Sequence, residues 1–245
     1  DYHPGCKRYD AEEKTYKISL SVPRSAARVN PSQQPISTIS SFSRIFIGMQ
    51  LIDGAALAME LRRALCQEIK TKGVRPFLKV LLVGDDQPSH LYVSLKRKAA
   101  EEVGIRVDVH ELSADIPKET LIQYIQDWNR DATVNAILVQ LPLPHREIEQ
   151  EVIDAIDPNK DVDGFHPKNV DSLVHGTGTI ISPLHQGILR LISQTPLHLH
   201  GAHSVIIANS EIFAKPLAYL LTKAGTYVDT VRSEEVKGSA LKSAD

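Results

Sequence analysis

The sequence predicts an α/β fold in which parallel strands alternate with helices that cover both faces of the sheet. Three observations lead to this prediction. Apolar runs at 77–83 and 136–139 have the length of buried strands. Amphipathic stretches of helical length lie between and after these runs. A second strand–helix–strand pattern begins near residue 198.

Two helices are expected where a capping residue precedes apolar residues at helical spacing. Asp53 can cap a helix over 54–70, because its carboxylate can accept a backbone N–H of the first turn. Ser89 can cap a second helix, which runs to Glu102 and is stopped by Gly104. These helices precede and follow the first apolar strand.

The remaining elements of the first half continue the alternation. The segment 106–112 alternates weakly between apolar and polar residues, as a strand does. Amphipathic helices are expected over 118–129 and 147–155, on either side of the strand at 136–139. Strands separated by helices in this way form a largely parallel sheet.

The second unit contains one strand–helix–strand repeat. Strands are expected over 203–208 and 226–231, with a helix over 213–223 between them and Gly225 just past its end. A complete doubly wound nucleotide-binding domain has about six strands. The sequence therefore predicts a partial nucleotide-binding domain over 196–245, after a catalytic domain over 49–195.

Composition excludes several classes of function. The hydrophobic content of 42% and charged content of 24% are typical of a soluble globular protein. A net charge of -2 gives no general attraction to nucleic acid or membrane. The cysteines, Cys6 and Cys66, lack the spacing of a zinc site, so no metal is expected. We expect a reducing compartment and a cytoplasmic location.

Residues 1–48 differ from the rest of the chain. They lack helical or alternating periodicity and contain a serine-rich stretch at 37–43. One interpretation is a targeting or linker extension, which makes a mitochondrial location the alternative. Asp10, Glu12 and Glu13 argue against a transit peptide. We favour the interpretation that this extension has no role in the fold.

Polar residues gather after the strand at 136–139. The segment 139–144 reads Val-Gln-Leu-Pro-Leu-Pro, and 157–166 reads Asp-Pro-Asn-Lys-Asp-Val-Asp-Gly-Phe-His. Ligands of open α/β sheets bind beyond the carboxyl ends of the strands. Acidic, amide and prolyl groups gathered there therefore predict a rigid pocket wall for a small molecule.

The second helix carries Tyr92 and Lys96 four residues apart, so both side chains lie on one helix face. A positioned amine can transfer protons, and a phenol beside it can pack on a substrate ring. On spacing alone we favour a surface lysine beside a half-buried tyrosine. A short-chain reductase is a remote alternative, because its glycine-rich turn would precede this pair.

Three blocks, 89–105, 139–144 and 157–165, occur in one order and at one spacing. Together they resemble the bifunctional methylenetetrahydrofolate dehydrogenase/methenyltetrahydrofolate cyclohydrolase family, over residues 49–245. The resemblance implies a folate-binding catalytic domain followed by a truncated Rossmann-like domain. It also implies oxidation of 5,10-methylenetetrahydrofolate with NADP or NAD, hydrolysis of the methenyl product to 10-formyltetrahydrofolate, and a homodimer.

The resemblance assigns roles to particular residues. Tyr92 would stack on and orient the substrate, Lys96 would be the acid/base for ring opening, and Gln140 would tune it by hydrogen bonding. Leu141 and Pro142 belong to the substrate-binding wall. Spacing leaves open which loop aspartate, Asp161 or Asp163, turns the chain and which faces the ligand. The resemblance selects Asp163 for the polar edge of the pterin.

Two motifs depart from the family. Its usual Pro-Cys-Thr-Pro is replaced by Ser-Pro-Leu-His at 182–185, although Gly187 remains. Its nucleotide turn has glycine where this chain has Ala208 and Ala214, and arginine where it has Asn209. Added methyl groups narrow the approach of a pyrophosphate to the backbone.

The expected cofactor-binding residues are Ala208, Asn209, Ser210 and Arg232, with a solvated arginine the favoured interpretation of Arg232. We expect weak NADP binding, because Asn209 cannot neutralise a 2′-phosphate and Glu211 adds a negative charge. The alternative function is a folate-binding or regulatory protein without dehydrogenase turnover. A metal site at His198, His200 and His203 is disfavoured, because the sequence places no carboxylate or cysteine close to them.

Overall fold

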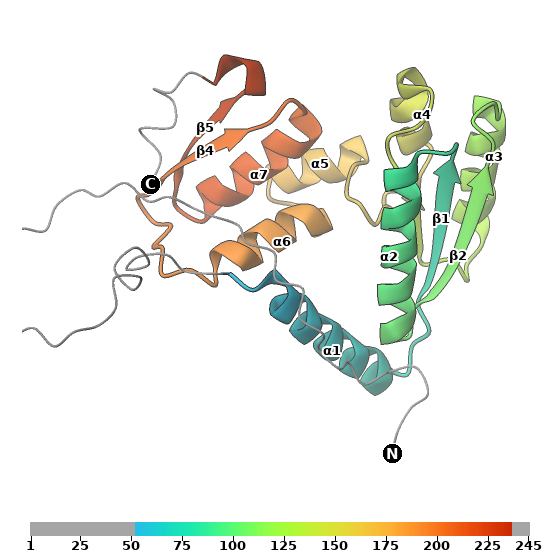
Figure 1. The fold of residues 1–245 in the computed structure, drawn as a ribbon, viewed down its shortest axis with the longest axis horizontal. Helices are drawn as coiled ribbons and strands as arrows, with labels where there is room; N and C mark the ends of the chain where they lie inside the picture. The colour runs from blue at the N-terminus through green and yellow to red at the C-terminus, as the bar shows by residue number, and fades with distance from the viewer. Residues whose placement is uncertain (1–51, 237–245) are drawn as a thin grey trace, which may run out of the picture.

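The computed structural model describes residues 52–236, which form two α/β units. Figure 1 shows the first unit, which contains strands β1 to β3, beside the second, which contains β4 and β5. The expected extension over 1–48 lies outside the described residues, as do residues 237–245.

The first unit is built on a three-stranded parallel sheet in the order β2–β1–β3. The strands are β1 (Phe77–Val83), β2 (Arg106–Leu112) and β3 (Ala136–Val139). All three were expected at these bounds, and their parallel pairing confirms the predicted sheet. Because the strands are parallel, the loops that follow them meet at one edge of the sheet.

Side chains alternate between the two faces of this sheet. Phe77, Leu81 and Val83 pack with α3 (Lys118–Arg130) and α4 (Glu149–Asp154) in one core cluster. The even-numbered residues of β1 pack with Val93 of α2 and Leu138 of β3 in a second cluster, which contains Val80 and Leu82. Both faces are thus covered by helices, as predicted.

The helix α2 (Gln87–Val103) begins three residues earlier than expected, since a helix capped by Ser89 would begin at His90. Its cap is Asp86, whose carboxylate accepts hydrogen bonds from both the backbone nitrogen and the hydroxyl of Ser89. The prediction that Ser89 is the cap was therefore wrong, because a better acceptor stands three residues before it. Gly104 ends the helix with a φ of 93°, as expected.

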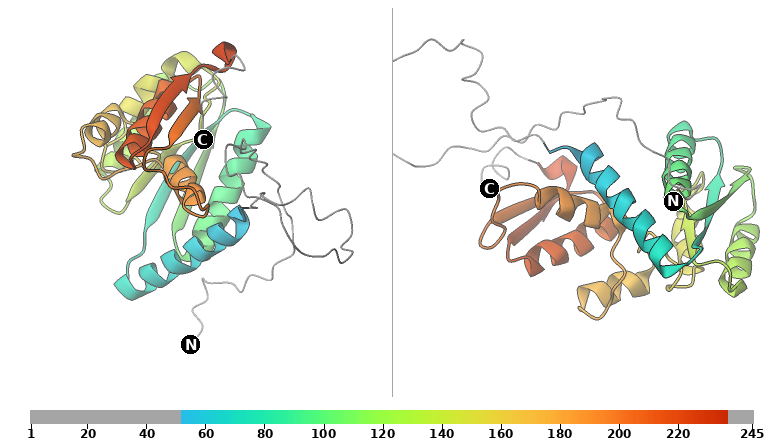
Figure 2. Two further views of the ribbon diagram at one scale, coloured as in Figure 1. Left: turned by 90° about the vertical axis from the view of Figure 1, so that its left-hand side faces the viewer. Right: turned by 90° about the horizontal axis from the view of Figure 1, so that it is seen from below.

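Two other helices differ slightly from expectation. The first helix, α1 (Gly54–Lys72), is capped by Asp53 as predicted and extends two residues further. The segment expected to form one helix over 147–155 is instead a 3₁₀ turn, η1 (Arg146–Ile148), followed by the short helix α4. Figures 1 and 2 show α1 extending from α6 of the second unit to α2 of the first.

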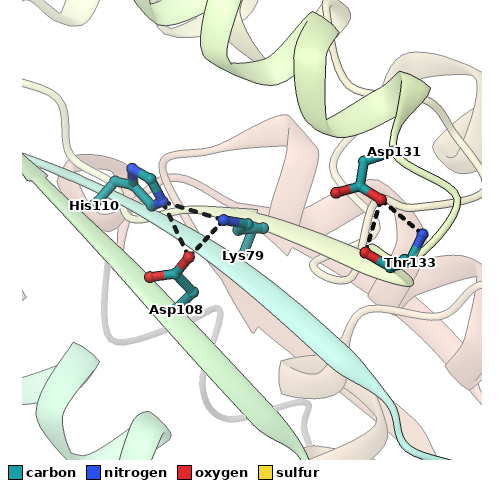
Figure 3. Close-up of polar contacts among 5 residues, drawn as sticks. All are labelled: Lys79, Asp108, His110, Asp131 and Thr133. Carbon is teal, nitrogen blue, oxygen red and sulfur yellow. Dashed lines mark hydrogen bonds and ion pairs between the residues drawn. The ribbon is translucent and has the colours of Figure 1, made fainter.

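The face of the sheet that packs on α3 contains a charged cluster (Figure 3). Lys79 of β1 forms an ion pair with Asp108 of the neighbouring β2, and its Nζ lies 3.3 Å from Nε2 of His110. The hydrogen bond from Lys79 holds the pKa of Asp108 below its ordinary value. The His110 ring packs 4.9 Å from the ring of Trp128 on α3. The polar side chains of Lys79, Asp108 and His110 are thus paired with one another on this face of the sheet.

The second unit contains β4 (His203–Ile207), α7 (Glu211–Lys223), β5 (Tyr227–Val231) and a 3₁₀ turn, η2 (Ser233–Glu235). The strands are parallel, which confirms the predicted strand–helix–strand unit. Helix α7 begins two residues before the expected start. Gly225 follows the helix with a φ of 95°, as expected of a residue past the helix end.

Two helices were not predicted from the sequence. They are α5 (Pro167–Val174) and α6 (Pro183–Ile192), and each has proline in its first turn. Proline suits that position because the first backbone N–H groups of a helix have no intrahelical partner. Helix α6 packs Ile188 and Ile192 against the core of the second unit. The predicted boundary at residue 195 remains a prediction.

Candidate functional site

Gln140 follows β3 directly and continues its pairing, because its backbone nitrogen donates to the carbonyl oxygen of Leu81 over 2.9 Å. Alternation along the strand places its side chain on the same face as Leu138, which is the face covered by α2. The Nζ of Lys96, on α2, donates to the Oε1 of Gln140 over 3.1 Å. The structure therefore joins two residues that lie 44 positions apart in sequence.

A second hydrogen bond fixes the orientation of the Gln140 amide. Its Nε2 donates to the carbonyl oxygen of Leu141 over 2.6 Å, so the amide oxygen faces Lys96. A lysine ammonium only donates hydrogen bonds, and an amide oxygen only accepts them. The pair is therefore oriented by contacts within the protein, and Gln140 holds the amine at the carboxyl edge of the sheet.

Tyr92 lies one helical turn before Lys96 on α2. Its side chain is 58% exposed, more than the half-buried tyrosine expected from spacing alone. Leu91 and Leu95 on the same helix are also exposed. An exposed aromatic ring beside the Lys96 amine is able to pack on a flat ligand.

Asp161 is the structural aspartate of the loop that follows α4. One carboxylate oxygen accepts from the backbone nitrogen of Gly164 over 3.0 Å. The other accepts from the backbone nitrogen of His166 and from Nδ2 of Asn169, each over 2.9 Å. The residue is 3% exposed. These bonds occupy Asp161 in shaping the turn, which leaves the other aspartate for a ligand.

Asp163 lies two residues further along and differs from Asp161 in its contacts. Within residues 52–236 its carboxylate has no hydrogen bond. Burial raises the pKa of Asp163, the positive charge of Lys96 lowers it, and the charge of Asp161 raises it again. A half-buried carboxylate without a donor is able to accept hydrogen bonds from a group that brings N–H donors.

The predicted wall residues Leu141 and Pro142 follow Gln140 and are joined by a cis peptide bond. Pro142 also lines a pocket of about 420 Å³ at the same sheet edge. Other residues of that pocket come from the loops after β1, β2 and β3; they are Val83, Gly84, Asp85, Asp86, Ala114, Leu143, Pro144 and Arg146. Lys96, Gln140 and Asp163 do not line it, so the predicted site and this pocket are neighbours that share Pro142.

The predicted cofactor residues of the second unit are engaged within the protein. Oδ1 of Asn209 accepts hydrogen bonds from the backbone nitrogen and the hydroxyl of Ser233, over 3.0 and 2.9 Å. Ala208 donates its backbone N–H to the carbonyl of Val231 over 3.0 Å. Ser210 is the N-cap of α7, although its side chain makes no capping bond. Asn209 thus ties the turn after β4 to the end of β5.

The charges around this turn offer little to a 2′-phosphate. Glu211 forms an ion pair with Lys215, and the hydrogen bond from Lys215 is the main reason that the pKa of Glu211 is lowered. The charge of the exposed Arg232 lowers that pKa further. The charge of Arg232 is therefore partly balanced by a carboxylate of its own chain. Ala214 is 5% exposed and packs in the core of the unit. These residues fit NADP poorly.

His185 is a buried residue whose contacts sequence reasoning missed. It is 1% exposed, and its Nε2 lies 2.9 Å from the carbonyl oxygen of Phe213 at the start of α7. Its Nδ1 is buried without a hydrogen-bond partner. Burial lowers the pKa of His185, and the bond to Phe213 opposes that shift. Its place in the altered Pro-Cys-Thr-Pro motif was the one available signal.

Metal-binding groups and membrane-spanning helices are both absent from residues 52–236. No group of three or more His, Cys, Asp and Glu side chains in this range could hold a metal ion. His203, one of the three histidines considered for a metal, lies 3.0 Å from the carboxylate of Asp229. No helix within the same residues has the length and apolar character needed to cross a membrane.

Comparison with known proteins places these features in context. Residues 52–163 match the family model of the tetrahydrofolate dehydrogenase/cyclohydrolase catalytic domain. The bifunctional protein FolD of Brevibacillus brevis is 42% identical over 186 residues, 75% of this chain and 66% of the relative. FolD of Streptococcus equi subsp. zooepidemicus is 39% identical over 197 residues, 79% of this chain and 69% of the relative.

Solved structures give the same result. FolD from Campylobacter jejuni, a methylenetetrahydrofolate dehydrogenase/cyclohydrolase, superposes with a TM-score of 0.75 at 36% identity, covering 81% of this chain and 72% of that one. The Trypanosoma brucei enzyme, solved with NADP and an inhibitor, gives a TM-score of 0.75 at 28% identity, covering 80% and 69%. The chain spans 66% of the Brevibacillus protein and 59% of its Salinibacter ruber counterpart.

Proposed function

This chain belongs to the tetrahydrofolate dehydrogenase/cyclohydrolase family, and on that basis we propose that it catalyses two steps of one-carbon folate metabolism. The first is oxidation of 5,10-methylenetetrahydrofolate to 5,10-methenyltetrahydrofolate with NADP or NAD. The second is hydrolysis of the methenyl compound to 10-formyltetrahydrofolate. The alternative of a folate-binding protein without turnover is not favoured, because the relatives are named as bifunctional proteins.

The contact between Lys96 and Gln140 is the observation that supports the hydrolytic step most directly. Hydrolysis adds water to the methenyl carbon, forming a C–O bond, and then breaks one C–N bond of the five-membered ring. A proton must leave the attacking water, and another must reach the departing nitrogen. Lys96 is the group proposed to carry these protons, and Gln140 orients its amine toward the reacting atoms.

Asp163 and Tyr92 are the groups proposed to bind the substrate. The pterin ring presents adjacent N–H donors, which a carboxylate accepts through both oxygens. The hydrogen-bonding capacity of the Asp163 carboxylate is unused by the described residues, whereas that of Asp161 is used by the turn. Tyr92 would stack on the substrate from the same helix face as Lys96. Leu141 and Pro142 would form the apolar wall beside Gln140.

The oxidative step draws on the second unit, where a bound nicotinamide would supply the hydride acceptor. The proposed contacts are Ala208, Asn209, Ser210 and Arg232. Because Asn209 already accepts two hydrogen bonds from Ser233, we propose that NADP binds weakly and that oxidation is slower than hydrolysis. A homodimer, a cytoplasmic location and domain limits of 49–195 and 196–245 remain parts of this proposal.

The experiment that tests the proposal measures both steps separately on the full chain. Methenyltetrahydrofolate absorbs near-ultraviolet light that the formyl product does not, so its loss reports hydrolysis. Formation of the same chromophore from methylenetetrahydrofolate reports oxidation, with NAD and NADP tested in turn. We expect hydrolysis well above the uncatalysed rate. Absence of any acceleration of hydrolysis, together with absence of folate binding by calorimetry, would reject the proposal.

A further inference from the structure

We infer that Lys160 is a positioning residue, which anchors the loop carrying Asp163 to the C-terminal end of α3. The inference rests on the proposed folate site and adds to it a residue that makes no contact with the substrate. It identifies what holds the ligand-binding carboxylate in place on the sheet edge.

All three N–H donors of the Lys160 ammonium bind one segment of the chain. A lysine ammonium has three N–H donors. The Nζ of Lys160 donates to the backbone carbonyl oxygens of Trp128, Asn129 and Asp131, over 2.9, 2.8 and 2.8 Å. Three backbone acceptors therefore converge on one side-chain nitrogen.

The three carbonyls lie at the end of α3 or just beyond it. The last four carbonyls of a helix have no intrahelical donor, and that end of the helix dipole attracts positive charge. Lys160 satisfies two carbonyls of the final turn, those of Trp128 and Asn129. The carboxylate of Asp131 accepts from the backbone nitrogen and the hydroxyl of Thr133 (Figure 3), so the bond from Lys160 goes to the backbone carbonyl of Asp131. Lys160 therefore binds the helix end itself.

The backbone of Lys160 is also held in place, by pairing with β3. Its carbonyl oxygen accepts from the backbone nitrogen of Ile137 in β3 over 2.7 Å, and Asp161 forms a parallel bridge with Ile137. Residues 160–162 thus run beside β3, the strand that leads into Gln140. This pairing brings Asp163, three residues after Lys160, into the electrostatic field of Lys96.

Asn129 provides a second tie between the same two segments. Its Nδ2 donates to the carbonyl of Ala155, and its Oδ1 accepts from the backbone nitrogen of Asp157, over 2.8 and 2.9 Å. The loop is thus held at its start by Asn129 and in its middle by Lys160. Since the side chain of Asp163 makes no hydrogen bond within the described residues, its position depends on these anchors and on the turn that Asp161 shapes.

The test compares three variants of the full chain. Lys160→Met keeps the length of the side chain and removes every donor, while Lys160→Arg restores donors and charge. Lys118→Met is the matched control, because Lys118 lies at the other end of α3 and forms an ion pair of 2.6 Å with Glu151. For each variant, KM and kcat of hydrolysis and the melting temperature are measured.

We expect Lys160→Met to raise KM about tenfold, as expected for weakening one hydrogen bond to a charged group, with kcat within about twofold of the parent. The split arises because Asp163 binds the substrate whereas Lys96 and Gln140, held separately, perform the chemistry. Lys160→Arg should recover most of the KM, and Lys118→Met should leave it unchanged. A fall of kcat and melting temperature at constant KM would mean that Lys160 is only structural and would overturn the inference.

A double variant tests whether Lys160 acts through Asp163. If it does, Lys160→Met adds less than about a twofold change in KM to Asp163→Asn, because both changes then weaken the same interaction with the substrate and are not additive. Equal effects in both backgrounds would reject the inference while leaving the proposed function intact.

Hydrogen exchange separates this inference from the proposed function itself. The backbone amides of Gly164 and His166, which donate to Asp161, should exchange faster in Lys160→Met than in Lys118→Met, whatever the catalytic activity. If the parent neither binds nor hydrolyses folate, the proposed function fails and the amide exchange alone decides whether Lys160 anchors the loop. Unchanged exchange at both amides would overturn the anchoring role.

Discussion

The loops that follow β3 and β4 occupy equivalent places, each at the carboxyl end of a parallel strand, but they use their polar side chains differently. After β3, Gln140 contacts Lys96, and Asp163 farther along has unused acceptors. After β4, the Oδ1 of Asn209 already accepts two hydrogen bonds from Ser233. The difference shows that position in an α/β fold predicts where a ligand site is expected. We propose that the unused hydrogen-bonding capacity of the side chains indicates whether such a ligand site is present.

The same contrast holds over two residues within the loop that follows α4. Asp161 and Asp163 have the same chemistry and almost the same place in sequence. Asp161 accepts three hydrogen bonds from its own chain, whereas Asp163 accepts none from the described residues. Burial raises the pKa of Asp163, and no hydrogen bond from the described residues opposes that shift. The proposed ligand-binding carboxylate therefore differs from Asp161 in having unused acceptors.

The largest expected effect is a loss of hydrolysis when the amine that contacts Gln140 is removed. Lys96→Met removes the amine while keeping length and apolar bulk, so hydrolysis should fall about 100-fold or more, as is usual for loss of a general acid–base group. Folate affinity by calorimetry should stay near that of the parent. Lys98→Met, two residues away on the same helix, serves as the control. Hydrolysis above about a tenth of the parent rate would exclude Lys96 as the main proton carrier.

The second prediction concerns the loop after β4. NADP should bind this chain more weakly than about 100 μM, because Asn209 is occupied and the charge of Arg232 is opposed by Glu211, and an exposed arginine contributes about 1 kcal/mol or less. Titration of NAD and NADP by fluorescence measures this. Asn209→Arg combined with Glu211→Gln should strengthen NADP binding and leave NAD unchanged. Micromolar NADP affinity in the parent would contradict the proposed contrast between the loops.

The third prediction separates the two aspartates. Asp163→Asn should weaken folate binding by about 1.5–3 kcal/mol, the contribution of a hydrogen bond to a charged group. The ligand-free protein should nevertheless melt slightly higher at pH 7. The folded pKa of Asp163 is raised, so its carboxyl contributes stability that is present at low pH and is lost as pH rises through the folded pKa. An amide at position 163 carries no charge at pH 7, so the folded protein does not lose this stability.

Asp161→Asn is the matched comparison for this variant. Asp161 accepts from Gly164, His166 and Asn169, so an amide in its place loses acceptors and the melting temperature should fall. If Asp163→Asn instead lowered the melting temperature and left folate affinity unchanged, Asp163 would be the turn residue and the assignment of the two aspartates would be reversed.

The sequence was sufficient for the sheet, because strands with continuous apolar residues and helices with one apolar face have distinct periods. It was also sufficient to bring Lys96 and Gln140 into one hypothesis, through their resemblance to known motifs. It was not sufficient for α5 and α6, for which no element was predicted. The bond between Asn209 and Ser233 was also unpredictable, since the two lie 24 residues apart and meet only when β4 and β5 pair.

The smallest expected effect concerns His185, whose polar ring is used for packing in the second unit. Burial lowers the folded pKa of His185 below its value of 6.5 in an unfolded chain, so the unfolded state binds a proton more readily. Stability should therefore be unaffected above about pH 7 and should fall as pH drops below 6.5, by at most about 1.4 kcal/mol per pH unit for one proton.

Since the chain has 10 histidines, the test is a difference between variants. His185→Gln keeps a donor for the carbonyl of Phe213 and does not titrate, so denaturant unfolding of this variant should lose less stability than the parent between pH 7 and pH 5. His175→Gln, whose side chain is 70% exposed on the surface just past α5, should follow the parent. If His185→Gln also followed the parent, the buried ring would be protonated as readily in the folded as in the unfolded chain.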